Sequence, residues 1–309
     1  MNRTIRVIGA PTDYGANRRG VDMGPSAIRY AGLSDAIASA GETCDDCGDI
    51  PAPLVEAAPE ETPEEAIPDA INARHLPSVR DVTRRLREEV AAPIADGELP
   101  VVLGGDHSVA IGSIGGSARN HEIGVIWFDA HGDFNTPETT PSGNVHGMAL
   151  AGVLGRGYFG TVDWAEATGV REENVVLLGL RDVDERERVA IRESDVTAFT
   201  MSDLDARGLN DVMDEALDVA SAGVDGIHVS LDLDWLDPHE APGVGTPVRG
   251  GVSYREAHAA LETVAEHDDR YDVLRSIDLV EVNPVLDERN RTAAMAAELL
   301  ASGLGKRIL

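Results

Sequence analysis

Short apolar segments of strand length alternate with helical patterns along most of the chain, and this alternation constrains the fold more than any other feature. The strand-like segments are bounded by glycine and rich in valine, isoleucine and leucine, which predicts buried parallel strands joined by helices. We expect strands at 4–9, 42–47, 99–103, 123–128, 174–178, 196–200, 226–231 and 271–279. We expect helices at 25–31, 79–90, 108–118, 145–154, 185–192, 210–221, 253–266 and 288–303.

The predicted fold class is α/β, with a single domain over residues 1–309 built as a three-layer α/β/α arrangement around a mostly parallel sheet. No internal repeat and no composition break of linker length divides the 309 residues. A chain of this length can bury roughly three quarters of its extended surface as one domain. The acidic, proline-rich segment near 51–70 is expected to be an exposed loop, because proline density opposes regular structure.

The charge balance argues against several classes of partner. The chain carries 55 acidic and 26 basic residues, for a net charge of −29, so nucleic acid and anionic lipid would repel it. The sequence shows no signal-peptide pattern and no run of 18 apolar residues, which predicts a cytoplasmic protein without a membrane span. Lys306 is the only lysine, and this acid-rich, lysine-poor composition predicts a salt-adapted (halophilic) source, where salt screens self-repulsion.

Side chains with metal-binding chemistry follow the third, fourth and seventh predicted strands. Ligands of open parallel sheets bind beyond the carboxyl ends of the strands, so side chains from these three ends should meet. Residues two apart in extended backbone project to the same side, which lets Asp129, His131 and Asp133 converge. The candidate metal ligands are His107, Asp129, His131, Asp133, Asp232 and Asp234.

Four carboxylates and two imidazoles in one place predict a pair of divalent metal ions. Burying that many carboxylates without cations would be prohibitively costly. Oxygen-rich ligation with some imidazole and no thiolate favours manganese over zinc. A two-metal site generates a hydroxide nucleophile at neutral pH, so hydrolysis is the expected reaction class. Each motif alone could be a helix cap beside a locally packed histidine, but three of them at strand ends favour the metal site.

Two further segments indicate the substrate. Residues 135–147 read NTPETTPSGNVHG and supply amide and hydroxyl donors suited to a carboxylate, together with His146. Glu281 follows the last predicted strand and suits a cationic substrate group. Trp127 and Trp235 are expected to be core residues beside the site. Cys44 and Cys47 form a C-x-x-C pair whose acidic neighbours disfavour a reactive thiolate.

Together these motifs resemble the ureohydrolase (arginase/agmatinase) family, and its arginase branch most closely. The resemblance covers nearly the whole chain and rests on GGDHS at 104–108, DAHGD at 129–133, SGNVHG at 142–147, DLDWLDP at 232–238, GTP at 245–247 and EVNP at 281–284. It implies two Mn²⁺ ions per subunit. One would be held by His107, Asp129, Asp133 and Asp232, and the other by Asp129, His131, Asp232 and Asp234.

The resemblance also implies a reaction, in which the guanidinium of L-arginine is hydrolysed to L-ornithine and urea. Asp133 would pass a proton to the leaving amine, His146 would shuttle protons, and Glu281 would pair with the guanidinium. The implied substrate-binding residues are Asn135, Thr140, Ser142, Asn144, Asp184, Glu187, Thr246 and Glu281. The family further implies a homo-oligomer, either a trimer or a hexamer.

Two other functions stay open at this point. An agmatinase or another guanidino-acid hydrolase would share the metal site, but a decarboxylated substrate would leave the donors of Asn135 and residues 142–146 unpaired. A non-catalytic metal-binding sensor would be expected to lose a bridging carboxylate or the shuttle histidine, and this sequence keeps both.

Overall fold

The strands lie in one sheet whose pairings are all parallel. The computed structural model describes residues 3–16, 18–52 and 71–307, so apart from residues 51 and 52 the loop predicted near 51–70 lies outside the described residues. The strands are β1 (Thr4–Ala10), β2 (Thr43–Asp49), β3 (Leu99–Gly104), β4 (Ile123–Phe128), β5 (Val170–Leu180), β6 (Thr197–Thr200), β7 (Gly226–Asp232) and β8 (Leu274–Val280). These eight strands are arranged in the order β2-β1-β3-β8-β7-β4-β5-β6.

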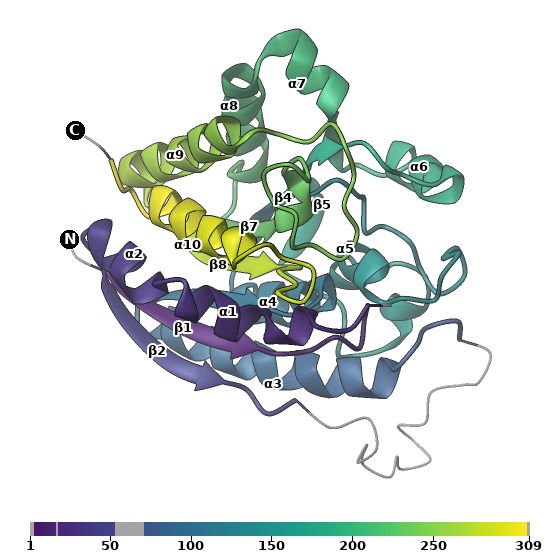
Figure 1. The fold of residues 1–309 in the computed structure, drawn as a ribbon. Coiled ribbons are helices and arrows are strands. Elements are labelled where there is room, and N and C mark those ends of the chain that lie inside the picture. The colour runs from purple at the N-terminus through teal and green to yellow at the C-terminus, as the bar shows by residue number, and fades with distance from the viewer. Residues whose placement is uncertain (1–2, 17, 53–70, 308–309) are drawn as a thin grey trace.

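Helices cover both faces of this sheet, which confirms the predicted three-layer α/β fold (Figure 1). Side chains of α1, α2, α8, α9 and α10 pack into one hydrophobic core, and those of α3, α4 and α5 into the other. None of the helices in the described residues has both the length and the apolar composition needed to cross a bilayer. The helices are α1 (Gly24–Tyr30), α2 (Leu33–Ser39), α3 (Leu76–Ala95), α4 (Ala110–Ser117), α5 (Ala149–Val153), α6 (Glu185–Arg192), α7 (Met201–Arg207), α8 (Leu209–Ala220), α9 (Tyr254–Tyr271) and α10 (Arg291–Gly303).

The central strands are apolar on both faces because helices cover both. In β4, Ile126 and Phe128 join the core beneath α8 to α10, while Val125 and Trp127 join the core beneath α3 to α5. Burying each such side chain stabilises the fold by about 1.5–3 kcal/mol. This two-sided burial explains why the strands read as continuous apolar runs rather than as alternating patterns.

The register of the central strands brings their carboxyl ends to one edge. Phe128 at the end of β4 pairs with Leu231 of β7, and Asp232 at the end of β7 pairs with Val280 of β8. Leu279 of β8 also pairs with Leu103 near the end of β3. The four adjacent strands β3, β8, β7 and β4 therefore deliver the residues that follow them to a common place.

Several predicted element boundaries were wrong, and the backbone gives the reason. The last helix begins at residue 291 rather than 288, because Arg289 and Asn290 have positive φ values of 58° and 61° that a right-handed helix does not accept. The helix predicted to end at 266 continues to 271, where left-handed Asp272 closes it, so β8 begins at 274 rather than 271.

Other differences concern short or extended elements. Helices α2 and α7 were not predicted, and each spans only 7 residues beside a neighbouring element. The helix predicted over 145–154 is a 3-10 turn, His146–Met148, followed by the short α5. Strand β5 is longer than predicted and runs from 170 to 180.

A substitution at Gly124 of β4 would test how closely helix α8 packs on the sheet. A Cβ atom at this position would lie 1.8 Å from the carbonyl oxygen of Ala220, the last residue of α8. Gly124→Ala should therefore lower the free energy of unfolding by about 3 kcal/mol or more, because backbone rather than a flexible side chain must move.

Gly32→Ala is the matched control, because Gly32 has a φ of 93° but no atom within 4 Å of the added methyl group. It should cost only the left-handed backbone penalty of about 1–2 kcal/mol. Chemical denaturation of both variants measures the difference, and equal losses would contradict the predicted contact.

Candidate metal centre and active site

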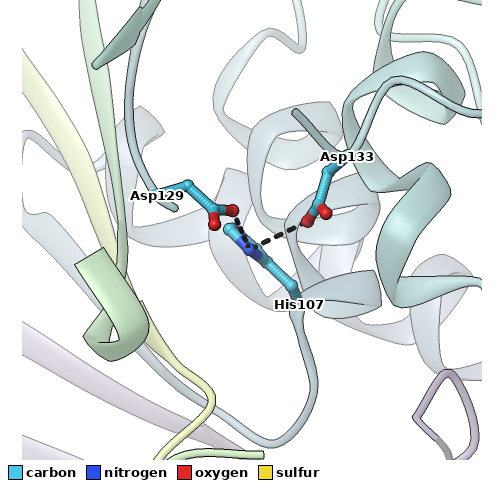
Figure 2. A group of neighbouring side chains, drawn as sticks. All are labelled: His107, Asp129 and Asp133. Atoms are coloured by element: carbon cyan, nitrogen blue, oxygen red, sulfur yellow. Dashed lines mark ion pairs between the residues drawn. The ribbon is translucent and has the colours of Figure 1, made fainter. Parts of the chain in front are cut away.

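His107 and three aspartates form a first buried cluster at the carboxyl edge of the sheet. His107 Nδ1 lies 3.2 Å from Asp129 Oδ2, 3.1 Å from Asp133 Oδ2 and 3.2 Å from Asp232 Oδ2. Figure 2 shows Asp129 and Asp133 on either side of the His107 ring. All four residues are buried. They come from three strand ends, as the motif positions predicted.

A second cluster shares Asp129 with the first. His131 Nδ1 lies 3.0 Å from Asp234 Oδ2 and 3.4 Å from Asp129 Oδ1. The backbone N–H of Asp234 donates to Asp232 Oδ1 at 2.7 Å, which holds these two carboxylates side by side. The structure thus brings all six predicted ligand residues together, with Asp129 in both groups of potential metal ligands.

The donor atoms fit divalent metal ions better than they fit hydrogen bonds alone. His107 Nδ1 is buried and makes no hydrogen bond to the described residues, although three carboxylate oxygens lie close to it. A single N–H could point at only one of those oxygens. A divalent cation among them would satisfy several of these atoms at once. The residues present therefore fit the metal sites that the sequence predicts.

The charges in the clusters are strongly coupled in the protein without metal. Burial opposes protonation of His107, but the surrounding carboxylates Asp129, Asp133 and Asp232 outweigh it and hold its pKa well above the usual range. Burial likewise opposes protonation of His131, and Asp234 and Asp129 outweigh it and raise its pKa. Burial raises the pKa of Asp133 to about 6. Protons therefore occupy the clusters unless other cations replace them.

Two of the predicted catalytic residues have strained backbone. Asp133 has a φ of 48° and Glu281 a φ of 63°, in the left-handed region that residues with a Cβ rarely adopt. Backbone hydrogen bonds hold both in place: the Asp133 carbonyl accepts from Leu150 and Ala151, and the Glu281 N–H donates to Gly105. The surrounding structure overcomes this strain, which is typical of functional sites.

Buried Glu281 and half-buried His146 form a pair next to the first cluster. His146 Nδ1 lies 3.0 Å from Glu281 Oε1, which also accepts the backbone N–H of His107 at 3.0 Å. Burial opposes protonation of His146, but Glu281 outweighs it and raises the pKa of His146 to about 9. The second carboxylate oxygen, Glu281 Oε2, is buried and has no hydrogen-bond partner among the described residues. That oxygen can accept hydrogen bonds from a cationic group.

An acidic pocket opens beside both clusters. Several of the residues that line it are carboxylates, which favours a cationic substrate. Thr246 Oγ1 donates to Asp234 Oδ2 at 2.9 Å, so the wall of the pocket is tied to the second cluster. The pocket is lined by His131, Asp133, Asn135, His146, Gly147, Asp182, Asp184, Glu187, Asp232 and Thr246.

One wall of the pocket is built on the first turn of α6. Asp184 caps this helix by accepting the backbone N–H groups of Arg186 and Glu187, and its other oxygen accepts from Asn135 Nδ2 at 2.7 Å. Burial raises the pKa of Glu187 to about 8. Asn135, Asp184 and Glu187 therefore lie together, as expected of residues that would bind one end of a substrate.

The remaining predicted substrate residues lie in the loop after Asn135. Thr140 Oγ1 accepts from the backbone of Gly143, and Ser142 Oγ accepts from the backbone of Asn144. Asn144 Oδ1 lies 3.3 Å from Arg74 Nη1. Thr140, Ser142 and Asn144 are not among the residues that line the pocket, so their contacts with substrate stay predictions.

Trp127 has a larger part in the site than the sequence indicated. It is fully buried, as expected, but its indole N–H also donates to Asp129 Oδ2 at 2.9 Å. Its ring stacks on that of His107 with 4.1 Å between centroids. Trp127 precedes Asp129 by two residues, so strand periodicity places both on one side and could have identified this contact. Asp182 and Gly147, which line the pocket, carried no comparable signal.

A parallel α/β sheet with two carboxylate–imidazole clusters at its carboxyl edge defines a metal-dependent hydrolase. The model of the Arginase family matches residues 3–305. The chain is 48% identical to an arginase of Bacillus subtilis (strain 168) over the full length of both proteins. The chain belongs to the arginase family, which confirms the resemblance in its motifs and, with the two clusters, supports a binuclear metal site.

Solved structures agree with this assignment. The structure of an arginase from Bacillus cereus is similar with a TM-score of 0.89 at 47% identity, covering all of both chains. A structure described as a hypothetical agmatinase from Burkholderia thailandensis is similar with a TM-score of 0.73 at 22% identity, covering 98% of this chain and 85% of that one. At that identity the likeness shows the fold alone.

Metal binding should release protons. The pKa values of His107 and His131 are raised in the protein without metal, so both rings carry two protons at pH 7 and must each lose one to act as ligands. We expect about two or more protons released per chain when both ions bind, and weaker metal binding as the pH falls.

Calorimetric titration of metal-stripped protein with Mn²⁺ measures this release when it is repeated in buffers of different ionisation enthalpy. His239→Ala is a suitable control, because His239 is exposed and pairs with Asp237 rather than with the clusters. Its proton release should equal that of the wild type. Metal binding without proton release at pH 7 would refute the ligand assignment.

Proposed function

We propose that this chain is a manganese-dependent hydrolase that converts L-arginine to L-ornithine and urea. The observation that carries the proposal is the unpartnered Oε2 of buried Glu281 beside two clusters of metal-ligating side chains. When bound, two ions would lower the pKa of water and so supply a nucleophile at neutral pH. Nitrogen and oxygen donors without thiolate favour manganese. Its ligands would be His107, Asp129, His131, Asp133, Asp232 and Asp234.

Glu281 would orient the guanidinium group of the substrate. Its Oε1 is occupied by His146 and by the backbone of His107, which leaves Oε2 as the acceptor for a guanidinium N–H. A charge-assisted hydrogen bond in a buried site is stronger than one in water. Thr246, on the pocket wall, would contact the same end of the substrate.

Asp133 and His146 would move the protons of the reaction. Both line the pocket, on the side of the first cluster. Asp133 would take the proton lost by the attacking water and pass it to the leaving amine. His146, whose pKa is raised to about 9, is protonated at neutral pH and would donate to the departing group before regaining a proton from solvent.

The other end of the pocket would recognise the α-amino acid group. Asn135 uses one amide hydrogen for Asp184, and its second is available to a carboxylate. Thr140, Ser142 and Asn144 in the same loop would complete the carboxylate contacts. Asp184 and Glu187 would bind the α-ammonium group. This end distinguishes L-arginine from agmatine, which lacks the carboxylate, and an agmatinase is the alternative that the fold alone leaves open.

Substrate preference tests the proposal. Purified protein loaded with Mn²⁺ should release urea from L-arginine with a kcat/KM at least 100-fold above that for agmatine, because the loop donors stay unpaired with agmatine. Equal or faster turnover of agmatine would overturn the choice of substrate.

Asn135→Ala sharpens this test. It should raise KM for L-arginine by about 10-fold or more, since a hydrogen bond to a charged group is worth about 1.5–3 kcal/mol. Agmatine serves as the internal control, because its turnover should change little.

We also propose a cellular setting. A net charge of −29 would repel nucleic acid and anionic membrane surfaces. We propose a cytoplasmic location. The family resemblance supports a homo-oligomer, either a trimer or a hexamer. The match of one family model to nearly the whole chain supports a single ureohydrolase domain.

Salt adaptation is a further part of the proposal. The single lysine and the 55 acidic residues suit a salt-rich cytoplasm, where the Debye length falls to about 3 Å at 1 M salt and self-repulsion is screened. The melting temperature should therefore rise by several degrees between dilute buffer and 2 M KCl. An unchanged melting temperature, measured with the metal content held constant, would refute it.

A further inference from the structure

A chain of buried polar side chains runs beneath the first cluster. His107 Nε2 lies 2.8 Å from Ser230 Oγ, and the Ser230 hydroxyl donates to Asp278 Oδ1 at 2.6 Å. Asp278 Oδ2 lies 2.9 Å from His228 Nε2, and His228 Nδ1 lies 2.6 Å from Ser276 Oγ. All five residues have an exposed fraction of 0%. This connected chain lies on a buried face of the sheet, where apolar side chains would otherwise pack.

Two adjacent strands build the chain in register. Ser230 of β7 pairs with Asp278 of β8, and His228 pairs with Ser276. His228, Ser230 and Asp232 are spaced by two residues, so all three project to one side of β7. The side of β7 that presents the candidate metal ligand Asp232 thus also carries the hydrogen-bonding side chains of His228 and Ser230.

The positions of the hydrogen atoms in this chain determine which nitrogen of His107 is free to bind a metal ion. The single hydroxyl proton of Ser230 goes to Asp278, so Ser230 must accept from His107 Nε2–H. When His107 loses its second proton, as metal binding requires, the neutral imidazole keeps one N–H on Nε2 and the lone pair lies on Nδ1. That nitrogen is the buried atom without a hydrogen bond that faces Asp129, Asp133 and Asp232.

Asp278 is well suited to set the direction of the hydrogen bond that the Ser230 hydroxyl donates. Burial opposes its ionisation, but His228 outweighs burial and lowers the pKa of Asp278. An ionised carboxylate can only accept hydrogen bonds. It therefore fixes the direction in which the Ser230 hydroxyl donates, and Ser230 in turn fixes the tautomer of His107.

We propose that Ser230 and Asp278 are positioning residues that fix His107 in the tautomer presenting Nδ1 to the first metal ion. The inference rests on the proposed two-metal function. Hydrogen-bond partners of metal ligands commonly set ligand orientation in this way, and losing one typically weakens metal binding by about 10- to 100-fold.

The second candidate histidine ligand has no comparable support among the described residues. His131 Nε2 lies 4.0 Å from Asp182 Oδ2, and 70% of the Asp182 side chain is exposed. The first metal ion therefore depends on a buried, preorganised histidine, while the second depends on one nearer to solvent. Substitutions in the polar chain should therefore change the binding affinities of the two ions by different amounts.

Three variants test the proposal in the full-length protein. Ser230→Ala removes the acceptor for His107 Nε2–H, and Asp278→Asn keeps the shape of the side chain while removing its charge. Ser113→Ala is the matched control, because Ser113 is equally buried in α4 and its hydroxyl has no hydrogen-bond partner among the described residues. Each protein is stripped of metal, checked for native circular dichroism and titrated with Mn²⁺ against a chromophoric chelator.

We expect Ser230→Ala and Asp278→Asn to lower the affinity for one of the two Mn²⁺ ions by about 10- to 100-fold. The affinity for the other ion should stay within about threefold of wild type. Electron paramagnetic resonance at one equivalent of retained Mn²⁺ should then show an isolated ion rather than a coupled pair. Ser113→Ala should bind both ions as the wild type does. Should Asp278→Asn fail to fold, Ser230→Ala, which removes a single oxygen atom, decides the question alone.

Two results would overturn the inference: tight binding of both ions by Ser230→Ala, or an equal loss in Ser113→Ala. The wild-type titration separates this inference from the proposed function. A wild type that binds fewer than two ions contradicts the two-metal function itself.

Discussion

Repulsion among four buried aspartates is the constraint on which the rest of this structure depends. Asp129, Asp133, Asp232 and Asp234 lie within a few ångströms of two imidazoles, and all four carboxylates are buried. A fold with this arrangement needs cations at that place, either protons on the histidines or metal ions. The parallel sheet supplies the scaffold, since its register brings the strand ends that carry these side chains to one edge.

The surroundings of the clusters are specialised to hold them. Trp127 stacks on His107 and donates to Asp129, so one core side chain orients two candidate ligands. Asp133 and Glu281 have left-handed backbone, which hydrogen bonds with helix α5 and with Gly105 maintain. The charges of the substrate, the pocket and the metal ions then act on one another. A cationic guanidinium would offset the negative charge that remains on the carboxylates of the pocket.

Sequence alone predicted the layers of the fold and the gathering of the metal ligands, because both follow from local patterns. Strand ends carry the ligands, and parallel strands share an edge. What sequence could not predict depends on tertiary contacts. The left-handed conformation of Asp133, the stacking of Trp127 on His107, and the polar chain through Ser230 and Asp278 all involve neighbours distant along the chain. The predicted start of the last helix failed because Arg289, a residue type that rarely has positive φ, is left-handed together with Asn290.

Two divalent ions would share Asp129 between the two clusters. A crystal structure of the protein grown with Mn²⁺, with diffraction data collected on both sides of the manganese absorption edge, tests it most directly. We expect two anomalous peaks per chain, one beside His107 Nδ1 and Asp133 and the other beside His131 Nδ1 and Asp234, each in contact with Asp129. A single peak, or peaks that leave Asp129 without a metal contact, would contradict it.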